Sequence, residues 1–227
     1  MLTRDFSGIA TWIFDLDETL YPPSAGLLAQ VDARMTAYIA RELGLAEAEA
    51  DRLRRLYWRD HGITLAGLVR HHAVAPAHFL EEVHSIELDG LAPDPGLAAA
   101  LAGLPGRRIV HTNAARAHAE RVLEALGLAG EIAAVYALED KGLVAKPAAG
   151  AYAHVLAAEA AAAAETAMVE DSARNLREPH RLGMATVWLD HLREGPTPEH
   201  VDHRTHDLAR FLRMAARRRD CGDAPTR

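Results

Sequence analysis

The stretch Phe14-Asp15-Leu16-Asp17-Glu18-Thr19-Leu20 comes at the end of a largely apolar run, Ile9–Phe14. An apolar run without alternation is typical of a strand that is buried on both faces of a parallel sheet. Its two carboxylates lie two residues apart where the strand ends, so both can face one site. Neighbouring carboxylates repel each other unless a cation or a proton neutralises them, which favours a functional site. For an isolated pair, a solvated acidic turn is an equally good interpretation.

Other apolar runs also end at polar residues that could do chemistry. Arg108–Val110 is followed by His111, Thr112 and Asn113; Ala167–Val169 is followed by Glu170 and Asp171; Thr186–Leu189 is followed by Asp190. Helical patterns lie between these runs, among them His118–Leu126 and the alanine-rich stretch Ala148–Glu165. Strands that alternate with helices predict an α/β fold with a doubly wound, mainly parallel sheet, a Rossmann-like core. In such a sheet ligands bind beyond the carboxyl ends of the strands, where these polar residues gather.

The segment from Pro22 to about Leu91 interrupts the alternation, because it contains no convincing strand pattern. Its apolar spacing and turn residues predict consecutive helices at about 28–43, 46–59, 64–74 and 76–83. We therefore expect an all-helical cap (residues 22–91) inserted into an α/β core (residues 1–21 and 92–210). Residues 211–227 are expected to form a flexible tail.

The composition excludes several classes of protein. The 227 residues are 49% hydrophobic and 25% charged, an ordinary globular balance. A formal charge of −7 argues against binding a nucleic acid polymer. No window approaches the about 18 apolar residues of a membrane span, and no signal pattern begins the chain, so we expect a cytoplasmic protein without membrane association. The one cysteine, Cys221, cannot form an intrachain disulfide or a cysteine metal cluster.

Taken in order, the short motifs resemble those of the haloacid dehalogenase-like phosphohydrolase superfamily. They are D-x-D-x-T (15–19), Thr112-Asn113, Lys146-Pro147, and Glu170-Asp171-Ser172 followed by Asn175. More narrowly, residues 14–22, 57–68 and 169–172 resemble the pyrimidine 5'-nucleotidase branch, which has a helical cap between the first two motifs. Two departures are modest: Ala114 stands where a glycine is common, and the alanine-rich run replaces a glycine-containing loop. Neither departure removes a reactive group.

The resemblance implies a role for each acidic residue of the first motif. Asp15 would be the nucleophile that forms an aspartyl phosphate. Asp17 would be the general acid and then the general base, with a pKa raised by neighbouring carboxylates. The implied cofactor is Mg²⁺, which prefers hard oxygen ligands. Its ligands would be Asp15, the backbone carbonyl of Asp17, and Asp171.

The remaining candidates would bind the phosphate, support the site or select the substrate. The phosphate-binding residues would be Thr112, Asn113 and Lys146. Outer support for the metal or for Lys146 would come from Glu170, Ser172 and Asn175. In the cap, the residues expected to face the leaving group are Tyr57, His61 and Thr64. Packing between the cap helices is an equally good interpretation of Tyr57.

These observations predict a Mg²⁺-dependent phosphomonoesterase that acts on a small phosphorylated metabolite, with pyrimidine nucleoside 5'-monophosphates as the leading substrates. Asp17 favours a phosphatase over a dehalogenase, because a departing halide needs no acid. A phosphatase of another metabolite, such as a sugar phosphate, and a phosphomutase remain alternatives. From other classes, a phospho-Asp signalling receiver is opposed by the long insertion after the first strand. A non-catalytic binding protein is opposed by the complete set of reactive positions.

Overall fold

The computed structural model describes residues 2–220, and six of its strands form one parallel sheet in the order β3-β2-β1-β4-β5-β6. The strands are β1 (Thr11–Phe14), β2 (Arg107–His111), β3 (Ala134–Tyr136), β4 (Thr166–Glu170), β5 (Ala185–Leu189) and β6 (His203–Thr205). The strand order reverses direction at β1, between β2 and β4. This arrangement confirms the predicted doubly wound core and places the carboxyl ends of β1, β2 and β4 side by side.

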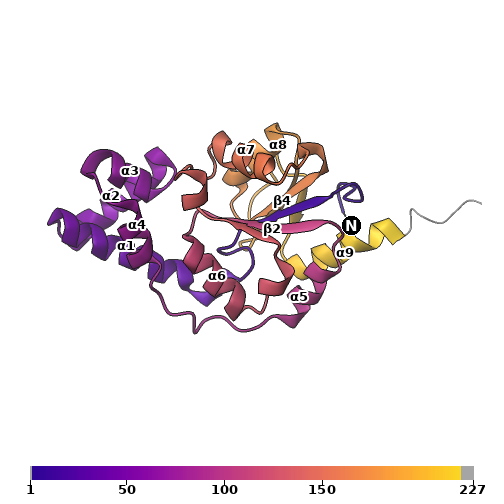
Figure 1. The fold of residues 1–227 in the computed structure, drawn as a ribbon, viewed down its shortest axis with the longest axis horizontal. Coiled ribbons are helices and arrows are strands. Elements are labelled where there is room, and N and C mark those ends of the chain that lie inside the picture. The colour runs from indigo at the N-terminus through magenta and orange to yellow at the C-terminus, as the bar shows by residue number, and fades with distance from the viewer. Residues whose placement is uncertain (1, 221–227) are drawn as a thin grey trace, which may run out of the picture.

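Helices cover both faces of the sheet (Figure 1). They are α5 (Pro95–Ala102), α6 (Arg116–Ala125), α7 (Ala149–Ala158), α8 (Arg177–Arg181) and α9 (Leu208–Asp220). Successive residues of β1 serve opposite faces: Trp12 and Phe14 belong to the apolar cluster that includes α5, α6 and α9, while Ile13 belongs to the cluster on the α7 side. All four residues of β1 are buried, which explains why its sequence does not alternate between apolar and polar residues.

Helix α9 corrects the prediction that a flexible tail begins at residue 211. Phe211 and Leu212 are almost completely buried, and the Phe211 ring meets Phe6 edge to face at 5.3 Å between centroids. The spacing of Leu208, Phe211 and Leu212 gives the helix an apolar face, which covers the sheet beside α5. The rest of the expected tail, residues 221–227 with Cys221, lies outside the described residues.

The two short strands β3 and β6 were absent from the sequence prediction. Each has three residues and lies at an edge of the sheet, where one side of the strand lacks a neighbour. β6 carries His203, Arg204 and Thr205 and so forms no apolar run, whereas β3 lies within the apolar stretch 132–138 but has only three residues, all half-buried. The alanine-rich stretch also departs from prediction, since α7 ends at Ala158 and a 3-10 turn follows at Ala163–Glu165.

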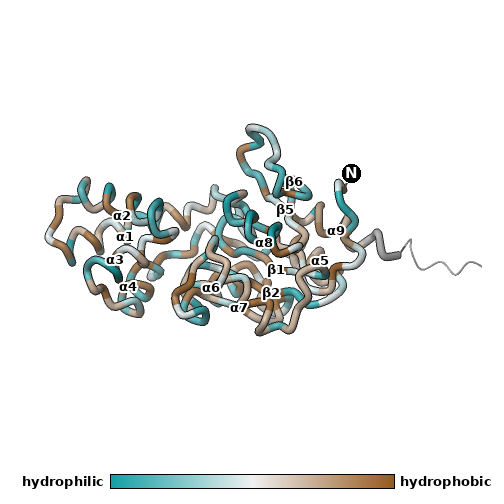
Figure 2. Tube along the Cα trace, turned by 90° about the horizontal axis from the view of Figure 1, so that it is seen from above, coloured by the Kyte–Doolittle hydropathy of each residue, from teal (hydrophilic) through white to brown (hydrophobic). Residues whose placement is uncertain are grey.

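The cap consists of four helices that lie apart from the sheet at one side of the core (Figures 1 and 2). They are α1 (Leu27–Leu43), α2 (Glu47–His61), α3 (Thr64–His72) and α4 (Pro76–Val83), close to the predicted spans. Their shared interior contains Tyr38, Leu68 and Phe79, all buried. Two connections join the cap to the core, and they touch where a Cβ on Gly90 would lie 2.3 Å from the carbonyl oxygen of Ala25. No helix within residues 2–220 is both long and apolar enough to cross a membrane.

Candidate active site

Asp15 lies directly beyond the last residue of β1. Its backbone N–H donates to the carbonyl of Val169 at 2.9 Å, which extends the pairing between β1 and β4 by one residue. The residue is 6% exposed, and its Oδ1 accepts a hydrogen bond from Lys146 Nζ at 2.5 Å. The Thr19 hydroxyl lies 3.4 Å from Oδ2 and accepts the backbone N–H of Asp171 at 3.1 Å. Thr19 thus ties the loops after β1 and β4 together.

Lys146 is buried between two carboxylates. Its Nζ lies 2.7 Å from Oε2 of Glu170 in addition to its contact with Asp15. Burial alone would lower the pKa of Lys146, but the negative charges of Asp15 and Glu170 outweigh burial and raise it. The side chain therefore stays an ammonium group and presents its charge at the site.

The residues after β2 are bound to this lysine through its backbone. Asn113 accepts the backbone N–H of Lys146 at 2.8 Å and donates to its carbonyl at 3.0 Å, so the amide holds the lysine in place. The Thr112 hydroxyl accepts the N–H of Ala114 at 2.9 Å, which leaves its proton free to be donated. Both residues line the cavity described below.

Three carboxylates are crowded together at this edge of the sheet. Ligand oxygens of Asp15, Glu170 and Asp171 all lie within 4.8 Å of one another. Burial and then the charge of Glu170 raise the pKa of Asp15 to about 7; burial and then the charge of Asp15 raise the pKa of Asp171 to about 7. Burial is also the largest cause that raises the pKa of Glu170 to about 7. A divalent cation would offset this crowding, and the oxygen donors fit Mg²⁺.

Both carboxylate oxygens of Glu170 are already engaged in hydrogen bonds. Its Oε2 accepts from Lys146, while Oε1 accepts from Asn175 Nδ2 at 3.2 Å and from the backbone N–H of Ser172 at 3.3 Å. Asn175 is in turn fixed by the hydroxyl of Tyr152, which donates to its carbonyl at 2.6 Å. Asp15 and Asp171 are therefore the carboxylates best placed to hold a cation.

The side chain of Asp17 has a different environment from the one predicted. Its Oδ1 accepts the hydroxyl of Tyr21 at 2.6 Å and lies 3.2 Å from Nε2 of His118. Burial alone would raise the pKa of Asp17, but the hydrogen bonds and charge of His118, with the bond from Tyr21, outweigh burial and lower it. The prediction of a raised pKa was wrong because donors rather than carboxylates surround this side chain.

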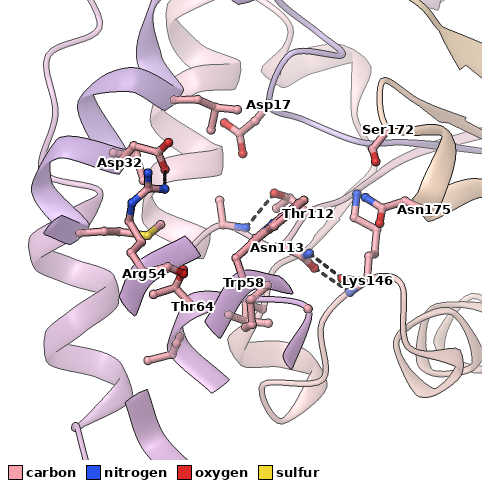
Figure 3. A pocket seen from close by; sticks show the side chains of 18 of the residues that line it. Asp17, Asp32, Arg54, Trp58, Thr64, Thr112, Asn113, Lys146, Ser172 and Asn175 are labelled. Carbon is pink, nitrogen blue, oxygen red and sulfur yellow. Dashed lines mark hydrogen bonds and ion pairs between the residues drawn. The ribbon is translucent and has the colours of Figure 1, made fainter. Parts of the chain in front are cut away.

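A cavity of about 1120 Å³ separates the cap from the carboxyl edge of the sheet (Figure 3). The predicted residues that line it are Asp15, Asp17, Thr64, Thr112, Asn113, Lys146, Glu170, Asp171, Ser172 and Asn175. From the cap side, Arg54 and Trp58 of α2 also line it, and Arg54 pairs with Asp32 at 2.6 Å. The ring of Trp58 is approached by the guanidinium of Arg174, on the core side, at 5.4 Å.

Two of the three predicted cap residues are not among those that line the cavity. Tyr57 is buried against α3, where its hydroxyl lies 2.7 Å from Nε2 of His72. His61 lies beside Tyr57, with its Nε2 3.3 Å from Nε2 of His71. One position along α2 turns a side chain by about 100°, so Trp58 rather than Tyr57 reaches the cavity.

Sequence reasoning gave no role to Thr19, Tyr21, Trp58 or His118. Thr19 is the last residue of D-x-D-x-T, so its place in the motif could have identified it. Tyr21 lies four residues after Asp17, within reach of a tight turn. His118 is 101 residues from Asp17 in the chain and carries no local signal.

Comparison with known proteins gives a consistent family relationship. The sequence profile of haloacid dehalogenase-like hydrolases matches residues 9–183. Phosphate metabolism protein 8 of Saccharomyces cerevisiae is 26% identical over 129 residues, which are 52% of this chain and 40% of the yeast protein. Magnesium-bound YfnB of Bacillus subtilis, a HAD-hydrolase, has a TM-score of 0.61 at 14% identity, with 91% of this chain and 98% of that chain covered. A HAD phosphatase of Thermococcus onnurineus gives 0.61 at 18% identity, with 91% and 97% covered.

Proposed function

This chain belongs to the haloacid dehalogenase-like hydrolase family, and from that premise we propose that it is a Mg²⁺-dependent phosphomonoesterase acting through an aspartyl phosphate. One observation carries the proposal: two carboxylates of opposite character line one cavity. Asp15 is crowded by other carboxylates and paired with a buried ammonium group, whereas Asp17 accepts hydrogen bonds from Tyr21 and His118. Such a pair suits two different roles, nucleophile and proton carrier.

In the first step an oxygen of Asp15 attacks phosphorus and the bond from phosphorus to the ester oxygen breaks. The electron pair of that bond goes to the departing oxygen, which takes the proton of Asp17. The negative charge of the arriving phosphate raises the pKa of Asp17, because a like charge nearby disfavours the carboxylate. Thr112 donates to a phosphoryl oxygen, and Lys146 offsets the charge that gathers around Asp15.

In the second step a water oxygen attacks the same phosphorus atom. Asp17, now a carboxylate, takes a proton from that water, the bond from phosphorus to the Asp15 oxygen breaks, and phosphate leaves. Asp15 is regenerated as a carboxylate and Asp17 again carries a proton. Asp15, Asp171 and the backbone carbonyl of Asp17 would hold Mg²⁺, which would neutralise charge on the phosphoryl group when bound.

The leading substrates in this proposal are pyrimidine nucleoside 5'-monophosphates. The resemblance of residues 14–22, 57–68 and 169–172 to the pyrimidine nucleotidase branch supports that choice, and so does a cavity large enough for a nucleoside. Trp58 replaces Tyr57 as the aromatic residue proposed to stack on the base, because Trp58 is 55% exposed and lines the cavity. Base stacking on such a ring contributes about 1–3 kcal/mol.

The proposal is tested by assaying the purified protein with Mg²⁺ against a panel of nucleotides, sugar phosphates and p-nitrophenyl phosphate. We expect phosphate release, highest for UMP and CMP, and a loss of at least ~10³-fold in Asp15→Asn. Acid-quenched protein should carry phosphate on Asp15. Near-normal hydrolysis by Asp15→Asn would end the aspartyl-phosphate mechanism. A panel led by sugar phosphates would overturn the nucleotide assignment and leave the phosphatase in place.

A further inference from the structure

Asp17 is held by two donors that come from different parts of the chain. Tyr21 belongs to the same loop, four residues further on, and His118 lies on α6. Both donors are buried, with the side chain of His118 only 1% exposed. Both approach the same carboxylate oxygen, Oδ1.

The other oxygen of Asp17 is left open. Within residues 2–220 no side chain or backbone group bonds to Oδ2, although Asp17 lines the cavity and lies at its edge in Figure 3. A carboxylate that is fixed through one oxygen has little freedom to rotate about its terminal bonds. Oδ2 is therefore the atom that can present a proton to a departing ester oxygen.

The surroundings of His118 argue that its contact with Asp17 is its main purpose. Its Nδ1 is buried and has no hydrogen-bond partner among the described residues, so the ring belongs to no wider polar network. Leaving a buried polar atom unpaired is costly, and a residue that serves only packing would be replaced by an apolar one. The ring of His84 lies against it at 4.8 Å between centroids and limits its rotation.

We propose that His118 and Tyr21 are positioning residues that hold Oδ1 of Asp17 so that Oδ2 faces the leaving oxygen. The inference rests on the proposed function, since it needs Asp17 to move a proton. It predicts an effect on proton transfer to the leaving group, whereas a merely structural role would affect every substrate alike. The dependence of the rate on the leaving group therefore distinguishes a positioning role from a merely structural one.

The experiment measures single-turnover release of the alcohol from p-nitrophenyl phosphate, phenyl phosphate and UMP, in order of increasingly poor leaving groups. Tyr21→Phe and His118→Leu should lose about 10-fold or more with UMP and less than about 2-fold with p-nitrophenyl phosphate, because misplacing a catalytic group costs rate only where that group acts. His118→Gln keeps an N–H donor and should recover part of the loss.

The matched control is Tyr136→Phe. The hydroxyl of Tyr136 also donates to a carboxylate at 2.6 Å, that of Glu159, but outside the cavity. We expect this variant to match the wild type with all three esters. If His118→Leu fails to fold, Tyr21→Phe alone tests the proposal, because this substitution removes only one hydroxyl group and keeps the ring.

Equal losses with all three esters, or no loss in Tyr21→Phe, would overturn the positioning role while the phosphatase stands. If Tyr136→Phe shows the same leaving-group dependence, the effect is not specific to Asp17 and the inference is wrong. A wild-type protein that releases nothing from any ester, or an active Asp15→Asn, would overturn the proposed function and the inference with it.

Discussion

Nζ of Lys146 lies 2.7 Å from Oε2 of Glu170, and both side chains are almost completely buried. The same ammonium group also binds Asp15. One cation thus balances two carboxylates in the interior, and removing that cation would leave both carboxylates without their counter-charge.

Lys146→Met should therefore lower the free energy of unfolding by about 3–5 kcal/mol at pH 8 in the presence of chelator, because two buried carboxylates lose their cation. The double variant Lys146→Met/Glu170→Gln should be more stable than Lys146→Met, since one of those charges is gone. Urea denaturation at equilibrium measures both. A double variant whose destabilisation equals the sum of the two single ones would show that the residues are not coupled.

Mg²⁺ should stabilise the folded protein as well as activate it. A ligand that binds only the native state raises the unfolding midpoint, and above its Kd the stabilisation grows with the logarithm of its concentration. We expect the midpoint to rise with Mg²⁺ in the wild type and in Asp89→Ala, which removes an exposed carboxylate elsewhere, but much less in Asp171→Ala. Ca²⁺ should also raise the midpoint, yet support little turnover, because its larger and looser shell misplaces Asp15. A midpoint that Mg²⁺ raises equally in all three proteins would remove Asp171 from the site.

Trp58 should control the choice of leaving group. Trp58→Ala should reduce kcat/KM for UMP by about 10-fold, the loss of one base stack, and spare p-nitrophenyl phosphate. His61→Ala should keep the wild-type ratio of UMP to AMP, because the structure places His61 beside His71 and outside the residues that line the cavity. The assignment made from sequence would be restored by two results together. The ratio of UMP to p-nitrophenyl phosphate activity would be unchanged in Trp58→Ala, and the ratio of UMP to AMP activity would be changed in His61→Ala.

Asp190 should make the fold sensitive to acid. Burial alone would raise the pKa of Asp190, but hydrogen bonds from Arg204 and from the backbone N–H groups of Leu192 and Arg193 outweigh it and lower the pKa. The folded protein therefore binds this proton less readily than the unfolded chain. The stabilisation is present above the unfolded pKa of about 3.9 and is lost as pH falls through the lower folded value.

Asp190→Asn should then cost about 1.5–3 kcal/mol in the free energy of unfolding at pH 7, and the difference from wild type should narrow towards pH 3. Urea denaturation across that range provides the measurement. Asp60→Asn, which changes an exposed residue paired with Arg59, should cost much less at either pH. A difference for Asp190→Asn that stays constant with pH would contradict the lowered pKa.

Much of the core could be predicted because its central strands are buried on both faces. Such strands need apolar residues throughout, and a polar candidate site residue follows the strand end, as Asp15 follows Phe14. The edge strand β6 escaped detection because its three residues are polar, and β3 was missed although it lies within an apolar stretch, 132–138, because only three residues of that stretch form the strand. The cap helices were predictable from apolar spacing, since each has one face in a shared interior.

The candidate site likewise has features that the sequence could predict and features that it could not. The residues proposed to act on phosphate lie in fixed motifs, so Asp15, Asp17, Lys146 and Asp171 could be named from the sequence. The surroundings that set the pKa of Asp17 come from His118, far along the chain, and from the direction in which Tyr21 turns. The residues facing the cavity on α2 depend on the rotation of one helix, which a sequence pattern fixes only to within a residue or two.

The contact between the two cap connections, at Ala25 and Gly90, gives the cap a pivot. A domain attached through two neighbouring segments turns most easily about the axis on which both bend. Asp15, Asp17 and Lys146 all lie on the core side of that pivot, so a swing of the cap leaves the reacting groups aligned. The same swing would carry Trp58 away from Arg174 and open the cavity mouth. Such a hinge would let substrate enter and product leave without disturbing the proposed reacting groups.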